Sequence, residues 1–349
     1  MSGGVDSSLA AKLMLEKGYA CIGCTMKLYD NEDAGVSRTK TCCSLDDVED
    51  ARSVAYRLGI PFYVFNFTEA FRGSVIRKFT ESYARGITPN PCIDCNYYLK
   101  FQKLYQRAML LGCDCIVTGH YARIAHENGK YVLKKAVDET KDQSYVLYQL
   151  TQEQLAHTVF PLGDRRKSEV RAMAERSGFC NAGKPDSQDI CFVPDGDYAS
   201  AVERFTGHRA PSGDFTDRNG AVLGQHRGII HYTIGQRRGL GISAQEPLYV
   251  CRILPESNTV VLGRNDNLFG TDALVRDFHW ISDEAPRSAI RCKAKIRYRQ
   301  PEQQVTAVPA GDDTVQLHFD EPQRAITPGQ AAVLYDGDTV LGGGVIARG

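Results

Sequence analysis

Apolar residues follow two different spacings along the first half of the chain. In several segments that end at or near glycine they recur every three to four positions, which predicts amphipathic helices. Short β-branched and aromatic runs between these segments are typical of strands. The expected helices span 9–17, 45–58, 68–83 and 99–111, and the expected strands span 20–26, 62–67 and 113–117. This alternation indicates an α/β fold, a doubly wound parallel sheet covered by helices on both faces.

The pattern changes near residue 204. Glycine and proline become frequent, helical spacing fades, and short β-rich runs appear, among them GIIHYTIG (228–235), PLYVCRIL (247–254) and NTVVLG (258–263). Beyond about residue 270 nearly every segment reads as strand or turn, which is typical of a small β-barrel. The expected organisation is therefore a catalytic domain over 1–204, a central β-rich domain over 205–270 and a C-terminal barrel over 271–349.

Composition excludes several classes of protein. Of the 349 residues 42% are hydrophobic and 24% charged, and 42 Lys and Arg balance 42 Asp and Glu, so nucleic-acid binding would need local basic patches. There is no apolar run of membrane-spanning length and no secretory signal. We therefore expect a cytoplasmic protein in which the 12 Cys serve reactive or metal-binding roles rather than a disulfide framework.

The first residues, MSGGVDSS, are typical of a phosphate-binding turn that opens a helix. Gly3 and Gly4 permit backbone conformations in which consecutive amide groups point at one anion. Ser7 and Ser8 add hydroxyl groups at a helix N-terminus, where the helix dipole also favours negative charge. The alternative is a glycine-rich turn with a serine helix cap.

SGGVDSS also resembles the signature of the pyrophosphate-loop (PP-loop) ATP pyrophosphatases. The resemblance implies cleavage of ATP between the α- and β-phosphates and adenylation of a carbonyl oxygen. In that superfamily a hydrophobic strand leads into the loop, whereas only Met1 precedes it here. We therefore expect that the natural start lies upstream, and that a sheet without its switch-point strand has a groove in its core.

The cysteines divide by their place in the predicted elements. Cys21 and Cys24 are three apart on a predicted strand and point to opposite faces, so they are expected to be buried rather than to share a metal. Cys113 and Cys115 share one face of another strand, where cysteine is a common small apolar residue.

Cys92 and Cys95 are different because they lie where a proline-shaped loop, TPNPCIDCN, turns into a helix. A helix N-terminus lowers the pKa of a thiol, and the thiolate is the attacking and ligating form. A reactive pair is one reading, and a small zinc or structural pair is the other. Cys191 lies far along the chain in a polar, Gly/Pro-rich stretch.

Eight motifs follow one another along the whole chain. They are SGGVDSS at 2–8, TPNPCIDCN at 88–96, TGHYAR at 118–123, KDQSYVLYQL at 141–150, DSQDICF at 186–192, GQHRGIIHYTIGQRRGLGI at 224–242, KIRYRQ at 295–300 and TPGQ at 327–330. Together they resemble the tRNA-specific 2-thiouridylase family, bacterial sulfurtransferases that thiolate the wobble uridine of tRNA, U34. The resemblance runs from residue 2 to the C-terminus.

This resemblance implies roles for individual residues. Cys191 would receive persulfide sulfur, and Cys95 would be the partner thiol that forms a disulfide with Cys191 as sulfur leaves. The residues implied at the ATP are Met1, Ser2, Gly3, Gly4, Val5, Asp6, Ser7, Ser8, Met26 and Gly119. Those implied at the target base are Asn90, Pro91 and Cys92, and those implied near the tRNA are His120, Lys141, Asp142, Gln143, Tyr298, Arg299 and Gln330.

Cys92 departs from the family pattern, because many relatives have aspartate there. With a third thiol at the site, Cys92, Cys95 and Cys191 could hold three irons of a [4Fe–4S] cluster and leave the fourth iron open to bind sulfide. Persulfide transfer and cluster-bound sulfide are therefore rival mechanisms. Both need ATP with Mg²⁺, for which Asp6 is a candidate although it could equally cap the helix. Persulfide transfer also needs a sulfur-donor protein, a cysteine desulfurase or a relay protein.

The segment RCKAKIRYR carries the clearest basic patch. Its five cations alternate along the sequence, so a strand would present them on one face; they are Arg291, Lys293, Lys295, Arg297 and Arg299. Such a face suits a phosphate backbone, and a solvated barrel surface is the alternative. The target base would have to flip out of the anticodon stack.

Two other functions remain open at the level of sequence. An amide-forming PP-loop synthetase would share the loop but have no use for Cys95 and Cys191. An RNA-binding protein with a degenerate nucleotide fold would not need intact Gly3, Gly4, Asp6 and Ser7.

Overall fold

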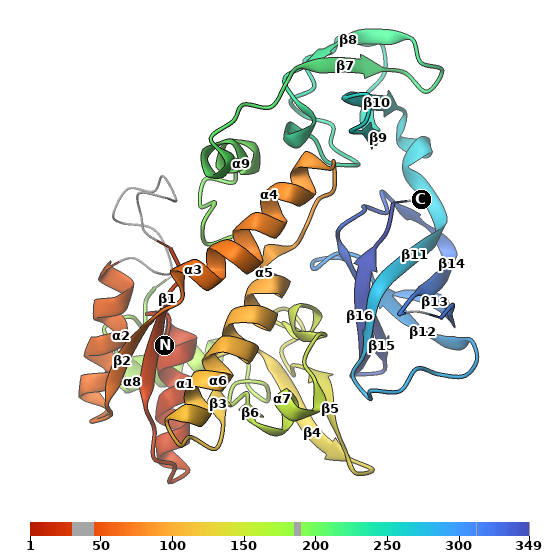
Figure 1. Ribbon diagram of the computed structural model, residues 1–349. Coiled ribbons are helices and arrows are strands. Elements are labelled where there is room, and N and C mark those ends of the chain that lie inside the picture. The colour runs from red at the N-terminus through yellow and green to blue at the C-terminus, as the bar shows by residue number, and fades with distance from the viewer. Residues whose placement is uncertain (30–44, 185–189, 312, 349) are drawn as a thin grey trace.

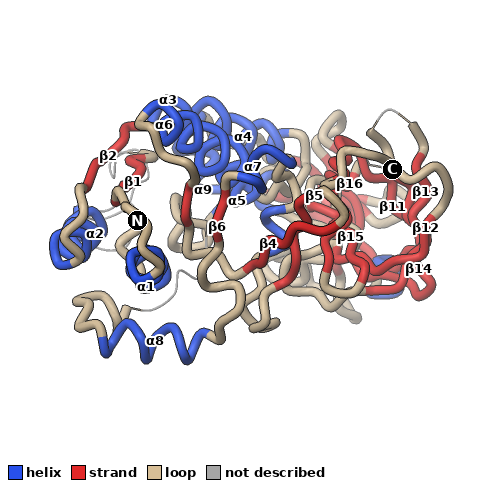
Figure 2. Tube along the Cα trace, turned by 90° about the horizontal axis from the view of Figure 1, so that it is seen from below, coloured by secondary structure: helices blue, strands red, loops and turns tan. Residues whose placement is uncertain are grey.

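The computed structural model describes residues 1–29, 45–184, 190–311 and 313–348 (Figure 1). The first four residues of the DSQDICF motif lie outside the described residues. The helical N-terminal part, the small central sheet and the C-terminal barrel occupy three different regions of the molecule. Figure 2 shows most helices towards one end and the barrel strands at the other. No helix of the described residues is long and apolar enough to span a membrane.

The first elements confirm the predicted alternation of helices and strands. Helix α1 (Val5–Glu16) follows the N-terminal loop directly, and Gly18 ends it with a positive φ of 86°. Strand β1 (Gly23–Lys27) pairs in parallel with β2 (Phe62–Asn66). Helix α2 (Leu45–Arg57) lies between these two strands in the sequence. Strand β1 starts later than predicted, so Cys21 precedes it and is only partly buried.

Two long helices follow, and each contains a π-helical stretch. The first runs through α3 (Thr68–Phe71), η1 (Arg72–Ile76) and α4 (Arg77–Ala84). The second runs through α5 (Pro91–Asp94), η2 (Cys95–Leu104) and α6 (Tyr105–Leu110). In the first helix the predicted apolar stripe is buried, namely Phe71, Val75, Phe79 and Tyr83. π-helical turns often mark functional sites, and the second one begins at Cys95.

A second parallel pair consists of β3 (Ile116–Val117) and β6 (Thr158–Val159). Among the described strands, this pair and the β1–β2 pair belong to separate two-stranded sheets. Met1 lies beside β1, where its carbonyl accepts a hydrogen bond of 2.6 Å from Thr25 Oγ1. The predicted strand over 113–117 is too long, because Cys113 and Cys115 precede β3 and are only partly buried.

A hairpin that the sequence analysis did not predict links the N-terminal part to the barrel. Strands β4 (Ala122–Glu127) and β5 (Lys130–Lys135) are antiparallel, and Asn128 and Gly129 turn between them at φ values of 50° and 79°. Positive φ at both turn positions suits an Asn-Gly hairpin. Thr339 of β16 pairs with Lys134 of β5, so the hairpin extends the barrel sheet.

Shorter elements complete the N-terminal part. They are η3 (Ser144–Leu147), α7 (Gln152–Ala156), α8 (Lys167–Arg176) and α9 (Tyr198–Thr206).

The central sheet has the order β8-β7-β10-β9. Its strands are β7 (Gly213–Thr216), β8 (Val222–His226), β9 (Tyr249–Leu254) and β10 (Thr259–Gly263). The prediction of β structure for GIIHYTIG is wrong, because this segment forms the short helix η4 (Ile229–His231). Ile229 and Ile230 are consecutive and both buried, which a strand with one solvent face cannot achieve.

The predicted C-terminal barrel is confirmed. After η5 (Asn265–Leu268), six strands follow in the order β11-β14-β13-β12-β15-β16, and pairing of β11 with β16 closes the sheet. The strands are β11 (Phe269–Trp280), β12 (Ile290–Lys295), β13 (Gln303–Pro309), β14 (Val315–Arg324), β15 (Ala331–Asp336) and β16 (Thr339–Ile346).

The predicted five-charge face does not form. Strand β12 ends at Lys295, so Arg297 and Arg299 lie beyond it. Arg291 makes two hydrogen bonds of 2.7 Å to Asp320, and Arg297 donates to the Arg324 carbonyl at 3.1 Å. Some of the alternating cations in RCKAKIRYR are therefore used in local hydrogen bonds and ion pairs, and the five do not form one basic surface.

Candidate functional site

The N-terminal loop has the geometry of a tight turn against α2. Gly3 has a φ of 71°, and a Cβ on Gly3 would lie 2.5 Å from the Asp47 carbonyl oxygen. Ser7 Oγ and Ser8 Oγ donate to the Gly4 carbonyl at 3.1 and 3.0 Å, so both hydroxyl groups stand in the first turn of α1. Only glycine fits at Gly3 without displacing backbone, and the free end of α1 is suited to an anion.

Asn181 holds this loop from a distant part of the chain. It is 3% exposed, and its Nδ2 donates to the Gly3 carbonyl and to Ser8 Oγ, both at 2.9 Å. Three residues later, Lys184 forms ion pairs with Asp47 and, at 2.9 Å, with Asp50 of α2. The segment that leads towards Cys191 is therefore fixed to the loop. The sequence analysis missed both residues, because nothing in their local pattern links them to residues so far away.

Asp6 lies in an ion pair at the start of α1. Lys167 Nζ, at the start of α8, is 2.7 Å from both carboxylate oxygens, and Tyr121 OH donates to Oδ1 at 2.8 Å. The Asp6 side chain therefore does not cap α1, because its carboxylate is bound by Lys167 and Tyr121. Participation of Asp6 in Mg²⁺ binding stays a prediction.

The residues after β3 contact the loop closely. A Cβ on Gly119 would lie 2.7 Å from the carbonyl carbon of Asp6 and 2.8 Å from the Ser7 nitrogen. Glycine at 119 therefore lets this connection rest directly on the first turn of α1. Met26, the other residue implied at the nucleotide outside the loop, lies in β1 and packs against the apolar cluster that Cys95 and Cys191 also border.

His120 is buried between the rings of Phe101 and Phe160, each with its centroid 5.8 Å away. Its Nδ1 lies 2.7 Å from Thr118 Oγ1, and its Nε2 lies 3.4 Å from Lys100 Nζ. Burial, reinforced by the Lys100 charge, holds the pKa of His120 well below its usual range. The imidazole is therefore neutral at physiological pH, and its predicted approach to tRNA stays a prediction.

The buried neutral imidazole predicts a pH dependence of stability. Because the pKa of His120 is lower in the folded than in the unfolded state, the unfolded chain binds the extra proton below about pH 6.5. Stability should therefore fall as pH drops from 7 towards 5, by at most about 1.4 kcal/mol per pH unit from this group. Urea unfolding of wild type and His120→Gln across this range would test it. Equal slopes for the two proteins would contradict the assignment.

The helix that carries the two thiols begins with a well-formed cap. The Asn90 side chain accepts from the Cys92 amide at 3.2 Å, and Pro91 occupies the first helical position, which needs no donor. Cys92 is exposed and Cys95 is partly buried. Loop and helix therefore position both thiols at a helix N-terminus, as the sequence predicts.

Cys191 approaches the same region from the opposite direction in the sequence. Its carbonyl accepts a hydrogen bond of 2.8 Å from Tyr29 OH, and its side chain borders the apolar cluster against which Cys95 also packs. Both side chains are thiols rather than half of a disulfide. Two cysteines 96 positions apart in sequence thus border the same apolar cluster.

The three thiols do not form a ready cluster site. Among the residues that the structure describes, no three His, Cys, Asp or Glu side chains are grouped so that they could hold a metal ion. Cys92, Cys95 and Cys191 are all described, so in this conformation they do not fit a [4Fe–4S] cluster.

Barrel residues meet the thiol-bearing loop. Gln330 Nε2 donates to the Thr88 carbonyl at 2.9 Å, and Tyr298 OH donates to the Asp142 carbonyl at 3.2 Å. Burial raises the pKa of Tyr298, with further contributions from Asp142 and from Cys92, so the phenol lies within electrostatic reach of that thiol. The residues implied at base and tRNA thus converge from three segments of the chain.

Two of these tRNA residues have structural partners. Asp142 is buried and accepts from the Ala136 amide at 2.9 Å and from Ser144 Oγ at 2.7 Å. The Gln143 side chain accepts from the Tyr121 amide at 2.9 Å. Both therefore shape the loop that carries Lys141, whereas Arg299 in the barrel is exposed.

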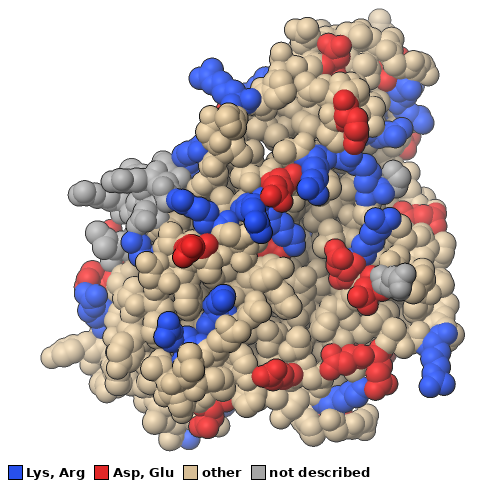
Figure 3. Space-filling view, in the orientation of Figure 1, with Lys and Arg blue, Asp and Glu red and all other residues tan. Residues whose placement is uncertain are grey.

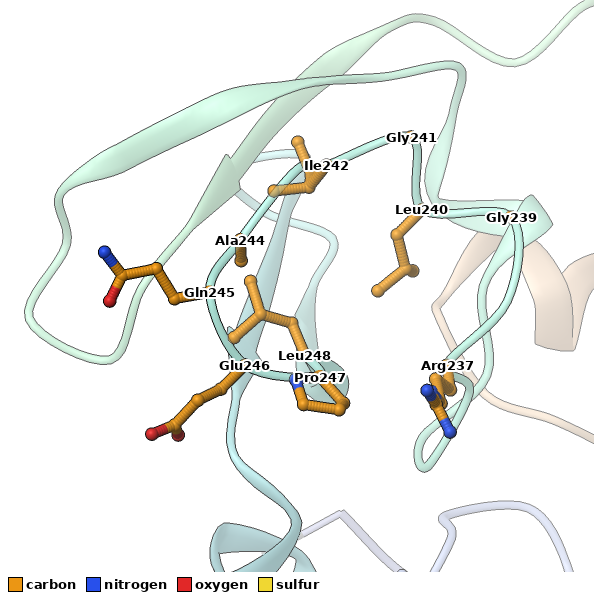
Figure 4. Close-up of a pocket in the computed structure, with 10 residues that line it drawn as sticks. All are labelled: Arg237, Gly239, Leu240, Gly241, Ile242, Ala244, Gln245, Glu246, Pro247 and Leu248. Atoms are coloured by element: carbon orange, nitrogen blue, oxygen red, sulfur yellow. The ribbon is translucent and has the colours of Figure 1, made fainter.

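Positive side chains form a band across the middle of the face in Figure 3, with acidic side chains interspersed. One groove of about 610 Å³ is lined by 66–70 with Arg72, Lys103 and Arg107. Another, about 380 Å³, lies within the central segment between Arg237 and Leu248 (Figure 4). Neither of these two grooves is lined by the predicted site residues.

Comparison with known proteins gives consistent results over the whole chain. Residues 1–195 match the family described as tRNA methyl transferase HUP domain, 201–264 the tRNA methyl transferase PRC-barrel domain, and 271–346 the aminomethyltransferase beta-barrel domain. Curated relatives include proteins named tRNA-specific 2-thiouridylase MnmA. That of Clostridioides difficile is 50% identical and the alignment covers 100% of this chain and 97% of the relative. That of Acetivibrio thermocellus is 50% identical, and the alignment covers 99% of this chain and 97% of the relative. That of Symbiobacterium thermophilum is also 50% identical, with 100% of this chain and 91% of the relative covered.

Proposed function

Because the chain belongs to the tRNA-specific 2-thiouridylase family, we propose that it replaces O2 of the wobble uridine of tRNA with sulfur. The reaction consumes ATP and releases AMP and pyrophosphate. Three observations support this proposal: a glycine loop at a helix N-terminus, two thiols beside one apolar cluster, and barrel residues hydrogen-bonded to the thiol-bearing loop.

Adenylation is the first chemical step. The uracil O2 is a poor leaving group, so it attacks the α-phosphorus of ATP, and the bond to the bridging oxygen of the β-phosphate breaks as pyrophosphate leaves. Amide groups around Gly3 and Gly4 and the dipole of α1 are suited to the pyrophosphate charge. Mg²⁺ would accompany the ATP, and Asp6 reaches it only if Lys167 releases the carboxylate.

Sulfur transfer is the second step. The terminal sulfur of a Cys191 persulfide attacks C2, and AMP leaves with the C2–O bond electrons. The Cys95 thiolate then attacks the Cys191 sulfur, which forms a Cys95–Cys191 disulfide and leaves the thiocarbonyl on the base. A dithiol reductant must reopen the disulfide, and a sulfur-donor protein must reload Cys191. The common apolar cluster of the two cysteines supports this pairing.

Binding of tRNA involves the barrel as well as the catalytic part. Gln330 donates to the 88–92 loop, and Tyr298 donates to the Asp142 carbonyl. Together with Arg299 these residues would surround a uridine flipped out of the anticodon stack. Phosphate contacts from exposed cations would supply affinity rather than base recognition. The proposed tRNA substrate and the reducing conditions required by three thiols favour a cytoplasmic location.

Nucleoside mass spectrometry tests the proposal directly. Unmodified tRNA is incubated with the protein, purified without oxygen, together with ATP, Mg²⁺, a sulfur donor and a dithiol. We expect 2-thiouridine to appear in an ATP-dependent manner, together with AMP. If neither 2-thiouridine nor tRNA-dependent AMP forms, the proposal is overturned.

A further inference from the structure

Lys100 connects the two halves of the proposed site. It belongs to the π-helical stretch η2, five residues after Cys95. Hydrogen bonds in such a stretch link residues five apart, so these two side chains leave the helix on similar faces. At its tip, Lys100 Nζ is 3.4 Å from His120 Nε2, next to Gly119, which rests on the first turn of α1.

The Lys100 charge also acts electrostatically on the start of the loop. Burial lowers the pKa of the Met1 amino group, and the charge of Lys100 contributes to the lowering. Lys100 thus lies near the residues that lead into the glycine turn as well as beside the histidine.

The charge on Lys100 lacks a counter-ion in the described part of the chain. No carboxylate there lies within ion-pair distance of it, and the imidazole within hydrogen-bond distance of it is neutral. Lys167 provides a contrast, because both its contacts with Asp6 are 2.7 Å long. A partly buried cation placed near a second positive group is unfavourable unless an anion joins it.

The proposed reaction supplies such an anion. In the adenylation step the α-phosphorus lies between the bridging oxygen to the β-phosphate and the attacking O2 of the uracil. The loop would hold the β-phosphate, and the uracil would lie at the thiols. The α-phosphate must therefore lie between loop and thiols, which is the interval that Lys100 spans.

We propose that Lys100 is a catalytic residue whose ammonium group contacts the α-phosphate of ATP and stabilises the charge that develops there as uracil O2 attacks. This role rests on the proposed function. Lys100 makes its contribution in the transition state, because charge on the α-phosphate oxygens is concentrated as the new bond forms and pyrophosphate leaves.

Lys100→Met tests the role, since methionine keeps the length of the side chain and removes its charge. The readout is tRNA-dependent AMP formation, which precedes sulfur transfer. We expect kcat to fall by about 10²- to 10³-fold with the KM for tRNA within about threefold of wild type. Lys100→Arg should recover part of the loss because it restores the charge.

Two further variants separate catalysis from support of the fold. Lys103→Met changes an exposed lysine on the same helix and should leave kcat for AMP formation unchanged. His120→Gln should lower kcat much less than Lys100→Met, whereas equal losses would mean that Lys100 acts by holding His120. Melting temperatures of all variants reveal any loss of fold.

The outcomes for Lys100 and for thiolation are distinguishable. If wild type forms AMP on tRNA but no 2-thiouridine, the sulfur-transfer proposal fails while the Lys100 comparison still stands. If Lys100→Met forms AMP at the wild-type rate, or if Lys100→Arg is no better than Lys100→Met, the role proposed for Lys100 is overturned.

Discussion

Cys191→Ser should abolish 2-thiouridine formation, by at least about 10³-fold, while AMP release on tRNA continues. A serine hydroxyl cannot carry a persulfide, so no sulfur reaches the adenylated base, although the loop around Gly3 is untouched. The adenylate would then be lost to water rather than to sulfur. Parallel measurement of AMP and of 2-thiouridine by mass spectrometry separates the two steps.

Cys180→Ser is the matched control for this substitution. Cys180 is exposed and lies in the segment that leads to Cys191. The Cys180→Ser variant should thiolate tRNA as wild type does. Cys95→Ser should also fail over repeated turnovers, because the mixed disulfide with the base has no partner thiol. Normal thiolation by Cys191→Ser would contradict the persulfide route.

Cys92→Asp distinguishes the persulfide route from a cluster. If sulfur travels on Cys191, aspartate at 92 should retain thiolation within about tenfold, since Cys92 passes no sulfur in that route. If a cluster were held by Cys92, Cys95 and Cys191, loss of one ligand would remove both iron and activity. Iron content measured on the same anaerobic samples decides between them.

Local sequence patterns correctly predicted the features that depend on interactions between residues close together in the sequence. The apolar stripe through Phe71, Val75, Phe79 and Tyr83 is buried as expected, and the turn before α1 has at Gly3 the positive φ that glycine permits. The barrel strands followed from alternation and turn residues. In each case the information lies within a few residues of the element it determines.

The errors arose where tertiary contacts override a local pattern. RCKAKIRYR alternates to its end, yet the strand stops at Lys295, and Arg297 turns to cap carbonyl groups near residue 324. GIIHYTIG has β-rich composition, but Ile229 and Ile230 are both buried within a short helix. Neither outcome could be known without the neighbouring elements.

The candidate site was predicted in its motifs but not in its supports. Asn181, Lys167 and Lys100 each act on residues far away in the sequence, and an isolated asparagine or lysine carries no pattern of its own. Family resemblance supplied the thiols and the loop. The fold adds Lys167, which neutralises the charge of Asp6, and Asn181, which anchors the loop. It also adds Lys100, which lies between the loop and the thiols.

Gly3→Ala should cause the largest loss at the nucleotide end of the site. Alanine at a φ of 71° is strained by about 1 kcal/mol, and its Cβ would lie 2.5 Å from the Asp47 carbonyl oxygen. Either the loop or α2 must move, which we expect to bring the total destabilisation to about 3 kcal/mol. The amide groups of the turn would then no longer point at one phosphate, so AMP formation should fall at least 10²-fold with a raised KM for ATP.

Gly18→Ala isolates the part of this effect that comes from the close approach to α2. Gly18 has a comparable φ of 86°, but nothing lies within 4 Å of a Cβ placed there. It should therefore lose only the strain energy, about 1 kcal/mol, and keep its rate of AMP formation. Thermal unfolding and initial rates of the two variants provide the comparison. Equal destabilisation and equal rates would show that the contact between Gly3 and Asp47 is not what shapes the loop.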